Sequence, residues 1–124
     1  MKRKTFLPVL PESGIKDNHL HVIISDPDID NNVMVVNITT FYCTGREDRS
    51  CIIKPGEHPF IVHNSYVPYN YAKEVNCIKL LNEKLKNKII FKDDVSLGLL
   101  QRIQEGAKKT NRLPLLFKKY FSQF

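Results

Sequence analysis

The stretch "HLHVIIS", residues 19–25, decides how we arrange the rest of the chain. Its apolar residues alternate with other residues, and successive side chains of a β-strand point to opposite faces, so the stretch predicts a strand. The alternation gives two sets: Leu20, Val22 and Ile24 on one face, and His19 and His21 on the other. We therefore expect a sheet with one packed face and one face that is wet or functional.

A second β-branched run, "VMVVNITT" (33–40), follows the turn-forming stretch "DPDIDNN". Asp, Asn and Pro favour a tight connection, so the two strands are expected to pair antiparallel. Alternation again gives two sets: Met34, Val36 and Ile38, and Val35, Asn37 and Thr39. If the apolar faces share one core, four polar side chains gather on the opposite face. These are His19, His21, Asn37 and Thr39.

The middle of the chain gives weaker signals. "CIIK" (51–54) predicts a short strand that ends at the turn "PGEHPF". "NSYVPYNYA" (64–72) suits an edge strand or an irregular segment, because Pro68 cannot donate to a ladder. "NCIKLLNEKLKNKIIF" (76–91) has a mixed period, which allows a strand, a hairpin, or a helix followed by a strand.

The last part of the chain predicts helices. In "DDVSLGLLQRIQEGAKK" (93–109), apolar residues recur every four positions: Val95, Leu99, Ile103 and Ala107. Asp93 or Asp94 suits the start of this helix, and Gly106 or the two lysines after it suit the end. A second short helix around "LPLLFKKYF" would carry Pro114 in its first turn.

Together these elements predict one mainly β domain over residues 1–124, a small, strongly curved β barrel with helices packed on it. A leader with a short strand (1–14) precedes the barrel core (15–92), and a basic helical end (93–124) follows it.

The formal charge of +6 is unevenly placed. Residues 84–124 hold ten Lys and Arg against three Asp and Glu, whereas residues 1–83 hold nine against ten. Such a basic end favours a polyanionic partner, either nucleic acid or an acidic protein, although a solvated lysine-rich surface gives the same pattern. No apolar run approaches the roughly 20 residues of a membrane-spanning helix. Three cysteines without C-x-x-C spacing favour reduced thiols in a cytoplasmic chain.

Histidine is the side chain most easily poised between proton donor and acceptor, and the chain has four: His19, His21, His58 and His63. Two imidazoles beside one phosphate are enough to cleave RNA by attack of its 2′-hydroxyl, if a cation or hydroxyl stabilises the negative charge of the transition state. Each of these histidines could equally be an ordinary half-exposed residue. An H-x-H metal site at His19 and His21 lacks further ligands at defined spacing, so neither a metal nor a cofactor is expected.

"HLHVIIS", "VMVVNITT" with its "TT" pair and the late amphipathic helix resemble, over roughly residues 15–110, the MazF/PemK/Kid-like toxins, endoribonucleases of type II toxin–antitoxin systems. The resemblance implies an SH3-like barrel, a homodimer, metal-independent cleavage of single-stranded RNA, and an acidic antitoxin over the RNA groove. The family's catalytic threonine falls on Thr39, and its catalytic arginine falls on His19. Its opening Gly-Asp pair is missing, and "PGEHPFIVHNSYV" has no counterpart in the family pattern.

The first hypothesis is therefore a toxin-like, sequence-selective endoribonuclease. Thr39 and His19 would contact the scissile phosphate, and His58, in the stretch without a counterpart, would share proton transfer. The expected substrate-binding residues are His21, Asn37, Arg46, Arg49, Ser65 and Tyr66. The alternatives are a non-catalytic module that binds nucleic acid or protein, and a subunit of a larger regulatory or defence assembly.

Overall fold

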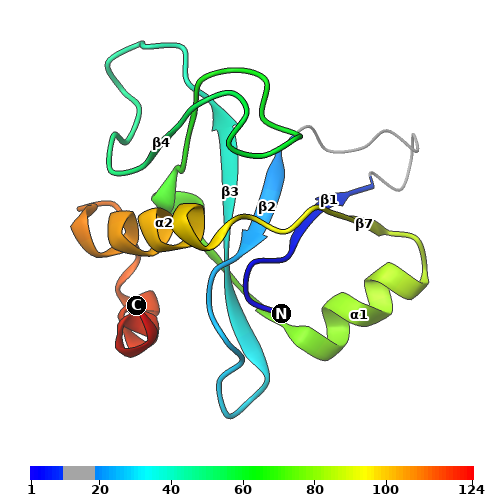
Figure 1. Cartoon of the computed structure of the whole chain (residues 1–124). Helices are drawn as coiled ribbons and strands as arrows, with labels where there is room; N and C mark the ends of the chain where they lie inside the picture. Colours follow the sequence, from blue (N-terminus) through cyan, green and yellow to red (C-terminus); the bar gives the residue numbers. More distant parts are fainter. Residues whose placement is uncertain (10–18) are drawn as a thin grey trace.

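The computed structural model describes residues 1–9 and 19–124 (Figure 1). The predicted leader and the start of the predicted core fall partly on residues 10–18, outside the described residues. In the described part the strands are β1 (Thr5–Pro8), β2 (Leu20–Ile23), β3 (Asn32–Thr40), β4 (Ile52–Ile53), β5 (Ser65–Tyr66), β6 (Lys73–Asn76) and β7 (Ile89–Lys92). The helices are α1 (Cys77–Leu85) and α2 (Leu97–Lys109), and two 3-10 segments are η1 (Tyr69–Tyr71) and η2 (Leu115–Gln123). None of these helices is long and apolar enough to cross a membrane.

The predicted hairpin of β2 and β3 is confirmed. The two strands pair antiparallel, with Leu20 opposite Ile38 and Val22 opposite Val36. The two apolar sets assigned to one face all belong to the larger hydrophobic core: Leu20, Val22, Ile24, Met34, Val36 and Ile38. Alternation along the sequence therefore placed these side chains correctly.

Strand β3 is the centre of the sheet, whose order is β4-β5-β3-β2-β1-β7. β2 pairs with one side of β3, and the other side pairs with β6 near its start and with β5 at its end. Every pairing is antiparallel. The predicted mainly β fold with packed helices is present. The predicted barrel is not confirmed, because β4 and β7 do not pair with each other in the described part and the sheet is not closed.

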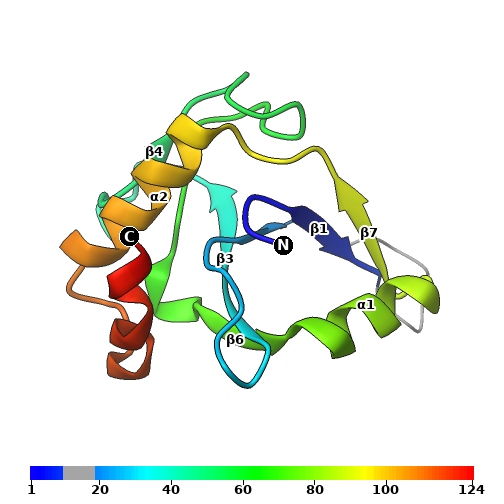
Figure 2. The ribbon, with the colours of Figure 1, turned by 60° about the horizontal axis from the view of Figure 1, so that its bottom comes forward.

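The second face of the sheet is only half polar, contrary to the prediction of one wet face. Near the start of β3 it carries a second hydrophobic cluster: Phe6, Ile23, Val33, Val35, Cys77, Leu80 and Ile89. The ambiguous segment 76–91 supplies the cover, because it forms α1 followed by β7. The Asn76 side chain caps α1 by accepting the Ile78 and Lys79 amide protons at 3.0 and 3.2 Å. Figure 2 shows α1 and β7 together beside β1.

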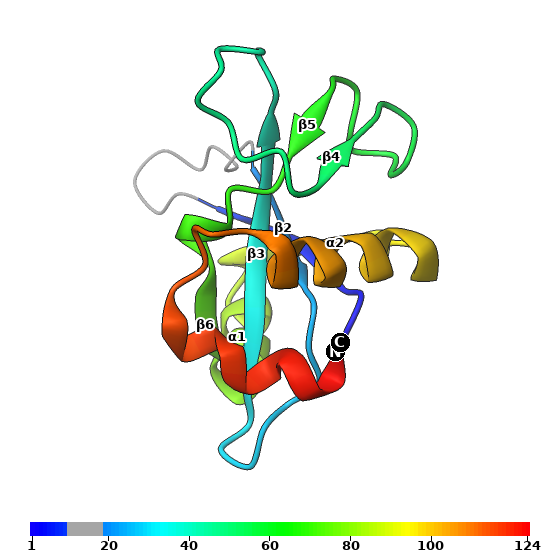
Figure 3. The ribbon, with the colours of Figure 1, turned by 90° about the vertical axis from the view of Figure 1, so that its left-hand side faces the viewer.

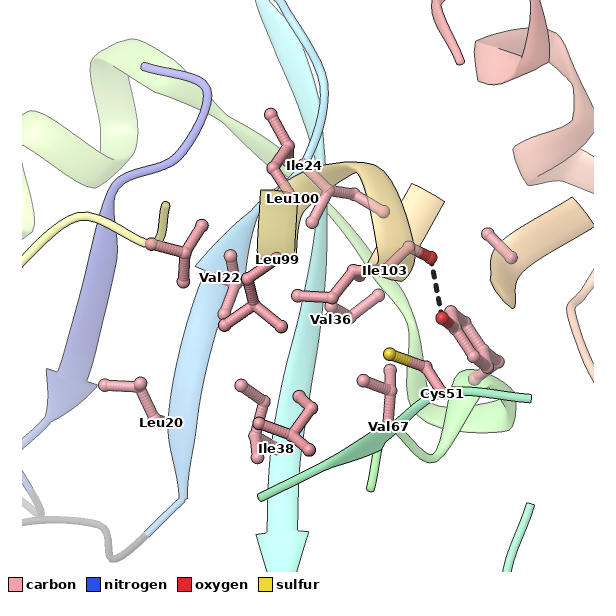
Figure 4. Close-up of a cluster of buried hydrophobic side chains, with 14 of the residues drawn as sticks. Leu20, Val22, Ile24, Val36, Ile38, Cys51, Val67, Leu99, Leu100 and Ile103 are labelled. Atoms are coloured by element: carbon pink, nitrogen blue, oxygen red, sulfur yellow. Dashed lines mark hydrogen bonds between the residues drawn. The ribbon is translucent and has the colours of Figure 1, made fainter. Parts of the chain in front are cut away.

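Helix α2 covers the larger core, where Leu99, Leu100 and Ile103 lie over β2 and β3 (Figure 4). It begins later than predicted, because the Ser96 hydroxyl, rather than Asp93 or Asp94, accepts the Leu99 amide proton at 3.1 Å. Gly106, predicted as an end signal, lies inside α2 and is buried.

A close approach explains the glycine at position 106. The buried Tyr69 hydroxyl donates to the Ile103 carbonyl at 2.6 Å. A Cβ atom at position 106 would overlap the Tyr69 hydroxyl and lie 3.0 Å from the Ser50 carbonyl oxygen. Only glycine therefore fits between α2 and Tyr69.

The predicted second helix is present as the 3-10 segment η2, and Pro114 precedes it instead of lying in its first turn. Figure 3 shows α2 and η2 on the same side of β3. Lys119 on η2 forms ion pairs with Glu74 at 2.6 Å and with Asp28 at 3.7 Å. One lysine of the basic end is therefore neutralised within the molecule.

Candidate functional site

A pocket of about 410 Å³ lies where β3 ends, β5 begins and the loop 54–64 turns back. Its polar lining comes from Thr39, Thr40, Tyr42, His63 and Ser65. Its apolar lining includes Leu20, Ile38 and Phe60. Hydroxyl groups and one imidazole thus converge in a concave, half-apolar site, which is the usual setting of a ligand pocket.

Backbone pairing fixes the polar wall of this pocket. Thr40 pairs with Ser65 across β3 and β5, and the Phe41 amide donates to the Asn64 carbonyl at 2.7 Å. The Ser65 hydroxyl donates to the His63 carbonyl at 2.9 Å, so its proton is used to hold the backbone of the loop. The side chain of His63 is exposed. Of the predicted site residues, Thr39 and Ser65 line this pocket; His63, which the sequence offered only as one histidine among four, lines it too.

Aromatic and cationic side chains adjoin the pocket. Tyr66 pairs with Thr39, and its ring lies edge-on to that of Phe41, with 6.0 Å between the centroids. The Arg49 guanidinium lies 5.1 Å from the Phe41 ring centroid. Phe41 and Tyr66 are half-buried, and Arg49 is exposed. Burial is the main cause of the raised pKa of Tyr66, with the Glu47 carboxylate adding to it.

The loop that carries Arg46 and Arg49 is held by a carboxylate. Glu47 accepts the amide protons of Tyr42 and Thr44 and the hydroxyl proton of Thr44, at 2.9 to 3.1 Å. Burial alone would raise the pKa of Glu47, but these hydrogen bonds lower it to about 2. The Arg46 carbonyl accepts from Arg112 at 2.8 Å. The backbone of the loop is therefore fixed, while the side chains of Arg46 and Arg49 are exposed.

The first two histidines differ in their surroundings. His21 pairs with Asn37, so the two residues share a face as predicted. Only 8% of His21 is exposed, however, and its ring stacks on Phe6 with 5.1 Å between the ring centroids. His21 Nδ1 also lies 3.0 Å from the His19 carbonyl oxygen. His19 is half-buried just before β2, whose first residue, Leu20, pairs with Ile38 and lines the pocket.

The surroundings of His58 are those of a buried, hydrogen-bonded side chain. His58 is only 2% exposed, its Nε2 donates to the Asp93 carbonyl at 2.6 Å, and its Nδ1 accepts the Phe60 amide proton at 3.1 Å. Because a carbonyl only accepts and an amide only donates, these partners fix one neutral tautomer. His58 lines a separate hollow with Lys92 and Asp93, so the structure does not bring it together with Thr39.

The described part of the chain has no metal-binding cluster at its cysteines. In residues 1–9 and 19–124, no three His, Cys, Asp or Glu side chains gather as metal ligands would. All three cysteines are free thiols. Burial raises the pKa of Cys51 to about 11, so this thiol stays protonated.

Comparison of the chain with family models, curated proteins and solved structures gave no match. The resemblance to MazF/PemK/Kid-like toxins stays a prediction from the sequence. Two observations therefore support the inference of a function: the pocket at the end of β3, and the aromatic surface that Phe41 and Tyr66 form beside it.

Proposed function

We propose that the chain binds single-stranded RNA across this pocket and the adjoining aromatic surface, and cleaves it as a metal-independent, toxin-like endoribonuclease. The observation that supports this most directly is the convergence of His63 and several hydroxyl groups next to Phe41, Tyr66 and Arg49. As part of the proposal, the curved sheet is a variant of the SH3-like barrel, and the chain acts in the cytoplasm as a homodimer restrained by an acidic antitoxin.

The aromatic surface supplies the binding energy. Stacking of a base on an aromatic ring contributes about 1–3 kcal/mol and tolerates any sequence, because every base has a π-face. Phe41 and Tyr66 offer such rings, and the Arg46 and Arg49 guanidinium groups can pair with phosphates on either side. The RNA would then cross the end of β3 with one phosphate in the pocket.

Cleavage requires two proton transfers at that phosphate. One imidazole accepts the proton of the 2′-hydroxyl, the 2′-oxygen attacks the phosphorus, and the bond from phosphorus to the 5′-oxygen breaks. The leaving 5′-oxygen takes a proton from a second imidazole, and a 2′,3′-cyclic phosphate remains. His63 and His19 take these roles in the proposal, in place of His58, and the Thr39 and Thr40 hydroxyls donate to the charged phosphate oxygens.

The test uses the purified chain and a pool of single-stranded RNA of varied sequence, with a chelator present. We expect cyclic-phosphate ends from the unchanged chain, loss of cleavage with retained binding for His63→Ala, and about tenfold weaker binding for Tyr66→Ala. Arg49→Ala should weaken binding, whereas Lys86→Ala, which removes an exposed charge at the end of α1, should not. An intact RNA pool would contradict cleavage.

Non-catalytic RNA binding is the second candidate, and one observation favours it. His63 is the sole imidazole that lines the pocket in the described part of the chain, since His58 lies elsewhere. In this case the RNA stays intact, His63→Ala has little effect, and affinity still falls steeply with salt as counterions are released. A flat salt response would contradict both candidates.

A further inference from the structure

Helix α1 exposes a regular apolar stripe. Its inner residues, Cys77 and Leu80, are buried in the second hydrophobic cluster. On another face, Ile78, Leu81 and Leu85 are 59%, 45% and 80% exposed. Their spacing of three and then four residues places all three side chains on one line along the helix. Single exposed leucines are common on protein surfaces, but an ordered stripe of this kind is typical of an interaction site.

The surroundings of the stripe are strongly basic. Residues 77–92 contain five lysines and only one acidic residue, Glu83. Lys79, Lys84 and Lys86 flank the stripe on α1 or at its end and are exposed. An occupant that buries the stripe therefore has to bring negative charge to its edges.

The charge and the length of α1 discriminate between possible occupants. A second copy of α1 would bring two sets of lysines together, which like-charge repulsion disfavours. The binding of an amphipathic helix to a membrane surface strengthens with the apolar area that the helix buries in the lipid, and large aromatic side chains add to that area. Helix α1 has nine residues, and none of them is aromatic. The nearby Phe91 ring is covered by two lysines: the Nζ atoms of Lys4 and Lys84 lie 5.3 and 5.4 Å from its centroid.

We infer that α1 is a docking surface for an acidic amphipathic helix of a partner protein. Ile78, Leu81 and Leu85 have the spacing of the apolar positions of a coiled-coil seam, so a helix with the same spacing packs its side chains between them. Acidic residues on the edges of that helix pair with the lysines. Figure 1 shows α1 at the opposite end of the sheet from β4, so this surface does not depend on the proposed RNA site.

The test titrates the 124-residue chain with a synthetic helix of roughly three heptads that carries Leu on the seam and Glu at the flanking positions. The amide signals of the chain are followed by NMR. We expect signal changes confined to α1 and its neighbours. A twin peptide with Lys at the flanking positions should bind at least about tenfold more weakly, as should the Leu85→Ser and Lys86→Glu variants. Leu97→Ser, which removes a leucine 60% exposed on α2, is the matched control and should bind normally.

Several outcomes would overturn the inference. The acidic peptide could leave the α1 signals unchanged, or bind Leu85→Ser as tightly as the unchanged chain. Sedimentation could show self-association that Leu85→Ser abolishes, which would assign the stripe to a second copy. Cosedimentation with phosphatidylcholine and phosphatidylserine vesicles that depends on Leu85 would assign it to a membrane surface.

Discussion

The two halves of the loop 54–64 differ in how they are held. In the first half, the side chain of Glu57 accepts from Arg102 on α2 and from the Lys54 amide, and buried His58 binds the Asp93 carbonyl. In the second half, Val62 is 68% exposed, and His63 and Asn64 are exposed beside the pocket. Two histidines five residues apart thus have opposite surroundings. Burial and hydrogen-bond partners, rather than residue type, therefore distinguish the anchoring imidazole of His58 from the exposed imidazole of His63.

The largest effect on stability is expected from His58→Ala, in the first half of the loop 54–64, which we call the anchored half. The change leaves the Phe60 amide without its partner, leaves the Asp93 carbonyl with the Thr5 hydroxyl as a donor, and opens a small cavity. We expect it to lower the free energy of unfolding by about 3 kcal/mol. Urea unfolding measures this loss. RNA cleavage should fall only as far as the folded fraction falls, so a stable His58→Ala protein without cleavage would restore a catalytic role for His58.

Gly106→Ala tests helix α2, whose Arg102 pairs with Glu57 of the anchored half. We expect it to lower the free energy of unfolding by about 2 kcal/mol. The new methyl group forces the Tyr69 hydroxyl away from the Ile103 carbonyl. Gly98→Ala is the matched control on the same helix, since a Cβ there meets nothing within 4 Å. Thermal unfolding should show that the control is stabilised by about 0.5–1 kcal/mol, because alanine favours a helix over glycine. Equal effects at both positions would show that the Tyr69 contact is unimportant.

Much of the fold could be predicted from alternation, whereas the site could not. Leu20 and Val36 reach the core because strand parity is a local property that the sequence displays. The cover on the second face could not be predicted, since Leu80 and Ile89 lie in a segment of mixed period and only tertiary packing selects a helix followed by a strand. The roles of His58 and His63 depend on long-range partners such as Asp93, which no local pattern reveals.

Acid pH should loosen the anchored half, with an effect on the order of 1 kcal/mol at this partly solvated pair. Burial alone would raise the pKa of Glu57, but the hydrogen bonds from Arg102 and the Lys54 amide lower it below its usual 4.5. A lowered pKa in the folded state means that the carboxylate stabilises the protein above pH 4.5 and that this contribution is lost as the pH falls through the folded-state value.

Urea unfolding at a series of pH values checks this prediction. Glu57→Gln should be less stable at neutral pH and should flatten part of the acid slope. Glu105→Gln is the control, because Glu105 is exposed and pairs with Lys108, three residues away. An unchanged acid slope in Glu57→Gln would show that the ion pair with Arg102 does not anchor the loop.

The smallest effect on stability is expected from His63→Ala, in the exposed second half of the loop 54–64. The side chain is exposed, so its removal should change the free energy of unfolding by no more than about 0.5 kcal/mol. The same urea experiment as for His58→Ala measures it. A loss as large as that of His58→Ala would remove the contrast between the two halves.

Strand β3 limits how the length of this chain can vary. It is paired along its start with β6, along its middle with β2 and at its end with β5. Deleting one residue within β3 would turn every later side chain to the reverse face, so that Asn37 and Thr39 would exchange places with aliphatic neighbours. The tip of the hairpin is restrained as well, because the Asp28 carboxylate accepts the Asp30 and Asn32 amide protons. Ile29 between them is 97% exposed, so substitution of its side chain is tolerable there, whereas an inserted residue would break these hydrogen bonds.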